Sequence, residues 1–192
     1  MGLFDTVSDQ TIRDGGCTDI YFVRTEEALA QDGINPKVAM EVTATALPDP
    51  WAVFCGLSDV IALLQGMPVT VDALPEGTVF YPHEPVLRIT GRYRDFCRYE
   101  TTILGFLCHA SGIATAAAQI RYIASGRPVY SFGSRRQHPA IAPMIERFIK
   151  DGRVVKQSGM QEARLRVLGQ VKDLPQIQSL LKKRDPASLM NR

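Results

Sequence analysis

The residues best suited to chemistry lie in one stretch, 128–143, which reads PVYSFGSRRQHPAIAP. Phe132 precedes a glycine turn that carries Arg135, Arg136 and His138. Planar guanidinium groups match carboxylate and phosphate, and free N–H groups at the start of a following helix favour an anion. We therefore expect the turn to hold a negatively charged substrate, with Phe132 stacking on a flat ring. The alternative is an ordinary solvated turn between strand and helix, with Phe132 in the core.

Three further candidates carry less specific signals. His138 either bonds an anion or caps the helix that follows. Asp19 and Tyr21 are two residues apart in a predicted strand and would point to one face, where they could contact a ligand ring and its hydroxyls. Cys108 and His109 are neighbours in a predicted helix and point apart, so we expect them to be buried and not to form a nucleophile pair.

The composition sets the class of protein. The 192 residues are 45% hydrophobic and 22% charged, which predicts a globular fold with one good core or two small ones. A net charge of +2 gives no support for nucleic-acid or membrane binding. The four cysteines form no C-x-x-C pair, no apolar leader precedes them, and no apolar run approaches the length of a membrane helix. We therefore expect a cytoplasmic protein. The three histidines lack metal-ligand spacing, so we expect no metal site formed by them.

The elements that must position these residues follow from periodicity and turn signals, and together they predict an α+β fold. The long helix at 99–124, interrupted near Gly112, should be buried on most sides, and its small residues Ala110–Ala118 suit a core or a subunit interface. Strands are predicted at 18–24, 37–45, 69–74, 78–81, 86–90, 129–130 and 153–157, and helices at 25–33, 51–65, 99–124, 139–149, 161–171 and 176–183.

Five motifs together resemble nicotinate phosphoribosyltransferase, a type II phosphoribosyltransferase. They are DGGCTDIYFVRT at 14–25, WAVFCGL at 51–57, LPEGTVFYPHEPVLRI at 74–89, YETTILGFLCHASGIAT at 99–115 and SFGSRRQHPAIAPMIER at 131–147. The likeness covers roughly residues 1–147, in order, and its motifs are long and specific. It leaves open nicotinate against nicotinamide or quinolinate.

The resemblance implies a reaction and a site. Nicotinate and phosphoribosyl pyrophosphate (PRPP) would give nicotinate mononucleotide and pyrophosphate, with Mg²⁺ and usually with ATP hydrolysis. It implies that Phe132 stacks on nicotinate, that Arg135 contacts anionic groups, and that Asp19 and His138 lie nearby, with Arg136 a weaker candidate. Tyr21 would come from the other subunit of a head-to-tail homodimer. The candidate catalytic residues are thus Arg135 and His138.

The resemblance also implies an α/β barrel, which the chain accommodates only in part. Such a barrel needs about 250 residues, yet only one strand–helix unit is predicted before the tail. We therefore divide the chain into a sheet and helix domain at 1–125, a first barrel unit at 126–150 and a tail at 151–192 that returns to the first domain. The phosphate site of the late barrel loops is expected to be absent. Three alternatives stay open: an enzyme, a non-catalytic remnant that dimerises, and an interaction module using the small-residue helix.

Overall fold

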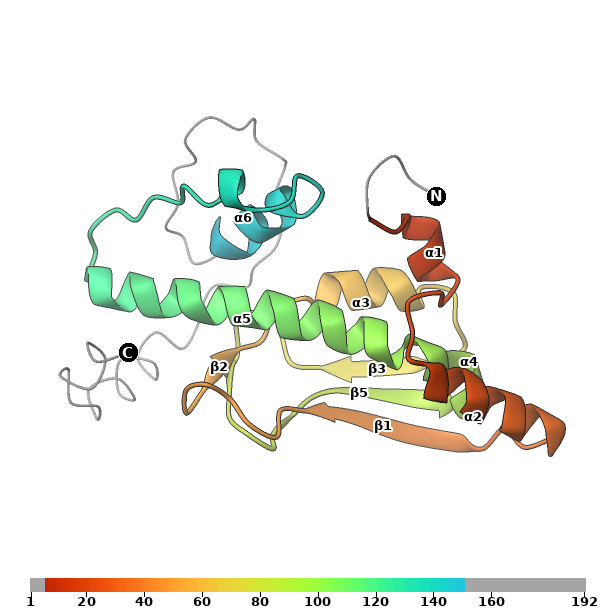
Figure 1. The fold of residues 1–192 in the computed structure, drawn as a ribbon. Coiled ribbons are helices and arrows are strands. Elements are labelled where there is room, and N and C mark those ends of the chain that lie inside the picture. Colours follow the sequence, from red (N-terminus) through yellow and green to blue (C-terminus); the bar gives the residue numbers. More distant parts are fainter. Residues whose placement is uncertain (1–5, 151–192) are drawn as a thin grey trace.

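The structure is a computed structural model that describes residues 6–150. Its main sheet has three antiparallel strands in the order β1 (Lys37–Thr43), β5 (Pro85–Arg92), β3 (Thr70–Ala73). The register pairs Val42 with Leu87, and both side chains are buried. The predicted strands 37–45, 69–74 and 86–90 are therefore confirmed (Figure 1).

A second, two-stranded sheet joins β2 (Ala52–Val53) to β4 (Val79–Phe80), which confirms the strand predicted at 78–81. Backbone N–H groups of the β2 segment donate to the side-chain hydroxyls of Ser111 and Thr115, which lie on the long helix. Val53 N donates to Thr115 Oγ1 (2.9 Å), and Cys55 N donates to Ser111 Oγ (3.0 Å). These bonds satisfy backbone groups that a two-stranded sheet would otherwise leave unpaired in the interior.

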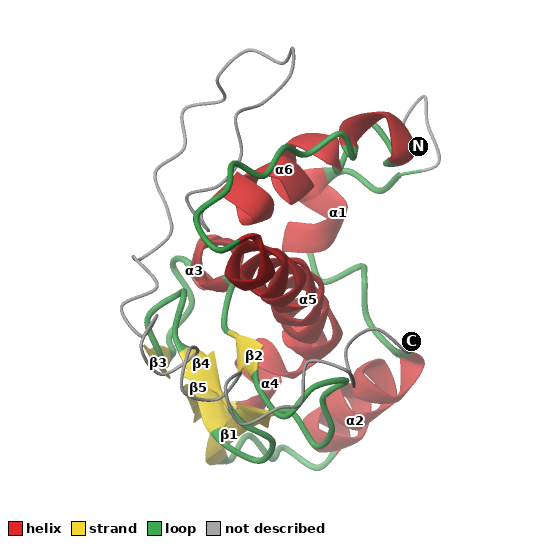
Figure 2. Cartoon of the chain, turned by 90° about the vertical axis from the view of Figure 1, so that its left-hand side faces the viewer, coloured by secondary structure: helices red, strands yellow, loops and turns green. Residues whose placement is uncertain are grey.

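The helix at the centre is α5 (Glu100–Ala124), which follows α4 (Tyr93–Phe96) and the 3-10 turn η1 (Cys97–Tyr99) directly. It is continuous through Gly112, so the predicted interruption is wrong. Figure 2 looks along it and shows the sheets on one side and α6 (Ala142–Lys150) on the other. One side of α5 is buried through Ile103, Leu107, Ala110 and Ala114, among others.

The expectation that α5 is buried on most sides is wrong, because its outer side faces solvent. Leu104, Ile120 and Ile123 are exposed there, as are Cys108 and His109, for which burial was predicted. The helical stretch Tyr93–Ala124 is long and apolar enough to cross a membrane by length and composition, contrary to the expectation from the sequence. Core helices of soluble proteins meet the same criterion, so this finding is a weak indicator.

The first two helices, α1 (Asp9–Arg13) and α2 (Ile20–Gln31), precede the sheet, so the strand predicted at 18–24 is wrong. Phe22 is the buried residue of α2, and the half-buried Glu26 and Leu29 follow at helical spacing. Glu26 forms an ion pair with Arg98 (Oε2–Nη2, 2.6 Å), which ties α2 to η1. The β-branched and aromatic residues at 18–24 favour a strand locally, but packing against η1 favours the helix instead.

The helix predicted at 51–65 is shorter than expected. All six residues from Trp51 to Gly56 are buried, and α3 (Leu57–Leu64) begins only after Gly56. Periodicity cannot separate a helix from a strand when every side chain of a run is buried. Gly56, at φ +96°, makes the turn between the two.

The last described unit contains η2 (Ser134–Arg136) and α6. Val129 forms only a single bridge, so the strand predicted at 129–130 is not extended, and α6 begins at Ala142, not at Pro139. Phe148 of α6 packs with Trp51, Ala110 and Ala114. The apolar side of α6 is thus packed against residues of the first domain. The elements predicted beyond residue 150 and the returning tail lie outside the described residues.

Candidate functional site

The turn between α5 and α6 is organised around one buried carboxyl group. Glu146 of α6 is only 6% exposed. Its Oε1 accepts hydrogen bonds from Ser134 Oγ (2.8 Å) and Ser131 Oγ (2.9 Å). Gly133 N in turn donates to Ser131 Oγ (3.3 Å). The turn is therefore connected to the helix that follows it in sequence, whose apolar side is anchored on α5.

Phe132 and Arg135 project from this turn into solvent. Phe132 is 59% exposed, which excludes the core position that was its alternative. The Arg135 guanidinium makes no hydrogen bond or ion pair with any residue in 6–150. Arg136 differs, because its Nη1 donates to Phe132 O (2.9 Å) and so supports the turn. The structure thus presents, on one short loop, an aromatic ring and a cation that has no partner in the described part of the chain.

His138 has a structural role at the entrance to α6. Its carbonyl oxygen accepts hydrogen bonds from Ile141 N and Ala142 N (3.0 Å each), and its Nδ1 accepts one from Ala140 N (3.2 Å). The capping alternative for His138 is thereby supported, since both groups order the residues before α6. Its contact with an anion stays a prediction.

Asp19 and Tyr21 lie at the start of α2, next to the start of α5. Asp19 Oδ2 accepts a hydrogen bond from Thr101 Oγ1 (2.8 Å). The pKa of Tyr21 is raised by desolvation and further by the neighbouring carboxyl groups of Asp19 and Glu100. The two residues thus do interact, but at a helix start, so the strand geometry predicted for them is wrong.

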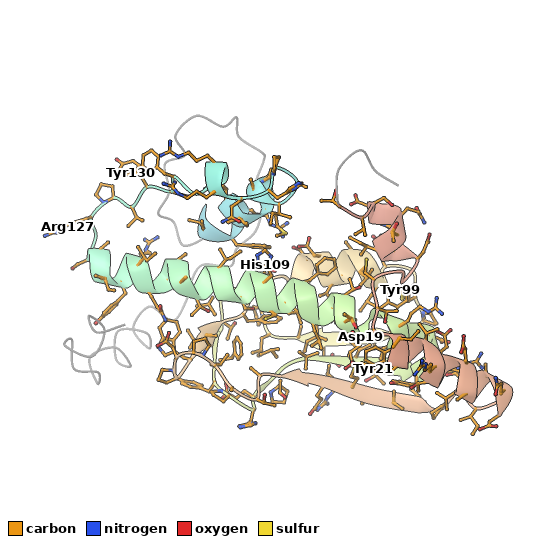
Figure 3. The ribbon with its side chains drawn as sticks, viewed as in Figure 1. Asp19, Tyr21, Tyr99, His109, Arg127 and Tyr130 are labelled. Atoms are coloured by element: carbon orange, nitrogen blue, oxygen red, sulfur yellow. The ribbon has the colours of Figure 1, made fainter. Side chains whose placement is uncertain are left out.

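The two groups of candidates are separated within one chain. Figure 3 places Asp19 and Tyr21 beside the beginning of α5, while Tyr130, two residues before Phe132, lies over its last turns. No hydrogen bond, ion pair or ring contact within residues 6–150 joins the two groups.

Glu146 was missed by the sequence analysis, although a signal for it exists. It lies next to Ile145 and two residues before Phe148, both of which face the core of an otherwise apolar helix side. An acidic residue at such a position requires polar partners, and the serines of the preceding turn are the nearest polar groups in sequence. The described residues contain no group of three or more His, Cys, Asp or Glu side chains that could hold a metal ion.

Residues 19–111 match the N-terminal domain of quinolinate phosphoribosyl transferase. A crystal structure of nicotinate-nucleotide pyrophosphorylase from Pyrococcus furiosus superposes with a TM-score of 0.79 at 50% identity, covering 83% of this chain and 41% of that one. These findings confirm the resemblance seen in the sequence: the chain is related to the type II phosphoribosyltransferases.

Two curated relatives are nicotinate phosphoribosyltransferases. A nicotinate phosphoribosyltransferase of Mycobacterium tuberculosis is 38% identical over 72 residues, which are 38% of this chain and 16% of that protein. The nicotinate phosphoribosyltransferase of Bacillus subtilis is 27% identical over 159 residues, covering 66% of this chain and 32% of the relative. The chain thus spans a third or less of the length of these two relatives.

Proposed function

We propose that the turn at 131–138 binds nicotinate for phosphoribosyl transfer from PRPP, yielding nicotinate mononucleotide and pyrophosphate. The observation that carries the proposal is the exposed ring of Phe132 on the same hydrogen-bonded turn as Arg135, whose guanidinium has no partner among residues 6–150. The nicotinate phosphoribosyltransferases among the relatives support this substrate class.

In this proposal the chain's residues act by orientation. Phe132 stacks on the pyridine ring, and Arg135 pairs with its carboxylate, which leaves the ring nitrogen free. That nitrogen donates its electron pair to the anomeric carbon, and the bond from this carbon to pyrophosphate breaks with its electrons leaving on pyrophosphate. Holding the base at bonding distance supplies much of the rate enhancement. His138 is proposed to contact the anionic groups from the same turn.

A second copy of the chain is proposed to complete the site. Asp19 and Tyr21 lie beside the start of α5, away from Tyr130 over its last turns (Figure 3). In a head-to-tail homodimer, Tyr21 of one copy would cover the nicotinate held by Phe132 of the other. Mg²⁺ and ATP are proposed from the resemblance alone, and the described residues offer no ligand cluster to which the metal could be assigned.

The charge of the turn favours nicotinate over its analogues. Quinolinate carries two carboxylates and nicotinamide none, whereas the turn offers one guanidinium, Arg135, that has no partner among the described residues; Arg136 is already bonded to Phe132 O. A second candidate function, a non-catalytic dimerising module, is favoured by the exposed Leu104, Ile120 and Ile123 on α5. Turnover separates the two candidates.

The test is the formation of nicotinate mononucleotide from nicotinate and PRPP, together with calorimetric titration of nicotinate. We expect Arg135→Ala to weaken nicotinate binding at least tenfold, because a charge-assisted pair contributes roughly 1.5–3 kcal/mol. Arg24→Ala on the exposed side of α2 is the matched control and should bind as the wild type does. Binding without turnover would favour the module, and absence of binding would refute the proposed substrate.

A further inference from the structure

Glu146 occupies an environment that is costly for a carboxyl group. It is 6% exposed and forms no ion pair with any residue in the described part of the chain. The adjacent Arg147 is directed elsewhere, to Asp59 of α3 (Nη2–Oδ2, 2.9 Å). Burial of a charged group without a cation is unfavourable unless hydrogen bonds compensate it. Among the described residues, the compensation comes from the two serine hydroxyls of the turn.

Each of these two serines directly precedes a residue that the proposed function uses. Ser131 precedes Phe132, and Ser134 precedes Arg135. Both hydroxyls donate to the same oxygen, Oε1 (2.9 and 2.8 Å), so the two ends of the segment 131–134 are fixed to one point. Further bonds close the turn, from Arg136 N to Gly133 O (2.8 Å) and from Gln137 N to Ser134 O (3.2 Å).

We infer that Glu146 is a positioning residue that, through Ser131 and Ser134, fixes the orientation in which Phe132 and Arg135 meet the substrate. Glu146 itself does not touch the ligand. The inference rests on the proposed function for its substrate. The orientation of the turn is nevertheless a property of the free protein, so it can be measured without any ligand.

What the turn requires from position 146 is an oxygen that accepts two hydrogen bonds. A glutamine side chain keeps one such oxygen in nearly the same place, whereas alanine removes it and leaves both hydroxyls without their partner. Comparing E146Q with E146A therefore tests whether the acceptor oxygen of the side chain, and not its charge, orders the turn. Arg147→Ala is the matched control, because it breaks the neighbouring ion pair between α6 and α3 and leaves the serine bonds intact.

The first measurement is amide hydrogen exchange of the full chain. In E146A we expect Gly133, Arg136 and Gln137 to exchange about tenfold faster or more, as expected for the loss of roughly 1.4 kcal/mol of local stability. The amide of Leu107 in α5 should be unchanged, and E146Q and Arg147→Ala should protect the turn as the wild type does. Unchanged turn amides in E146A, or the same selective loss in Arg147→Ala, would overturn the inference.

The second measurement is titration with nicotinate. We expect E146A to bind about tenfold more weakly and E146Q to stay within about threefold of the wild type. Failure of E146Q to rescue binding would overturn the positioning role. If the wild type itself does not bind nicotinate, the proposed function fails, and hydrogen exchange alone decides the role of Glu146. Should E146A not fold, Ser134→Ala, which removes one of the two bonds, takes its place with the same expected exchange pattern.

Discussion

At the scale of single residues, the carboxyl group of Glu100 at the start of α5 contributes to raising the pKa of two neighbouring tyrosines, Tyr93 and Tyr21. Burial raises the pKa of Glu100 above its ordinary value. Burial is also the main cause of the raised pKa of Tyr93, to which the charges of Cys97 and Glu100 contribute. Because Tyr21 responds to Glu100 as well, this end of the helix favours neutral side chains.

The raised pKa of Glu100 predicts a pH dependence of stability. Its pKa is higher in the folded than in the unfolded chain, so its contribution is fully present below the unfolded value and is lost as pH rises through the folded value. Glu100→Gln should therefore raise the melting temperature relative to the wild type at pH 7, and this advantage should shrink towards pH 4. Thermal unfolding followed by circular dichroism measures it. A difference that stays constant from pH 4 to pH 7 would contradict the prediction.

The sequence was informative about some residues of the site and uninformative about others. Phe132 and Arg135 stand out in the sequence because an aromatic ring and a cation on a glycine turn indicate binding by their type alone, and the structure shows both side chains exposed. The contact of Asp19 with Thr101 could not be predicted, since it joins residues far apart in sequence. The same holds for Glu146, whose role depends on how α6 folds back over its own turn.

At the scale of elements, the junction between β2 and α3 depends on a glycine. Gly56 has a φ of +96°, and a Cβ atom placed on it would lie 2.6 Å from Phe106 O of α5. Its N–H donates to Glu76 Oε1 (2.8 Å), which also lies within 3.4 Å of Ser58 N. A carboxylate from the loop between β3 and β4 thus caps α3, because glycine offers no side chain to do so.

Gly56→Ala should therefore be strongly destabilising, and Gly66→Ala is its matched control. Gly66 has a similar φ, +87°, but nothing lies within 4 Å of the position a Cβ would take. The free energy of unfolding of the control should fall only by the cost of the left-handed conformation, roughly 1–2 kcal/mol. Gly56→Ala adds a clash with the backbone of α5 and should lose at least about 2 kcal/mol more. Urea unfolding measures the free energy of unfolding of both variants. Equal losses would show that the backbone of α5 moves to accommodate the added methyl group.

The elements that could be predicted share one property, a clear pattern on a half-buried surface. Strand β1 alternates exposed side chains with half-buried or buried ones, and β5 and the buried side of α5 also show clear patterns. Two of the elements that were predicted wrongly lack such a pattern. The run 51–56 is buried throughout, and 18–24 contains residues that favour a strand although the chain places no strand partner beside them.

At the scale of the whole molecule, the two halves of the proposed site lie on different elements. Asp19 and Tyr21 lie at the start of α2, whereas Phe132 and Arg135 lie on the turn before α6, and no hydrogen bond, ion pair or ring contact within residues 6–150 joins them. A dimer in which each copy supplies one half to the other brings the halves together, and it makes each site depend on both chains.

Mixing two defective variants tests this dependence. Tyr21→Ala and Arg135→Ala should each weaken nicotinate binding, because each removes one side of the proposed site. After the two are mixed and subunits exchange, half of the sites in each heterodimer carry neither substitution, so about a quarter of all sites should bind normally. Calorimetric titration gives this fraction. No recovery in a mixture that sedimentation shows to contain heterodimers would refute the shared site.

The order of strands in the main sheet determines when this protein can begin to fold during its synthesis. Strands β1 and β3 both pair with β5 and not with each other, and β5 is the last of the three to be made. Until Arg92 has left the ribosome, neither earlier strand has its partner. Because α4 and α5 follow β5 directly, the helix that covers the sheet emerges immediately afterwards. Sheet and helix therefore form in one late, cooperative step, and the smallest unit that can acquire tertiary structure on the ribosome extends from β1 through α5.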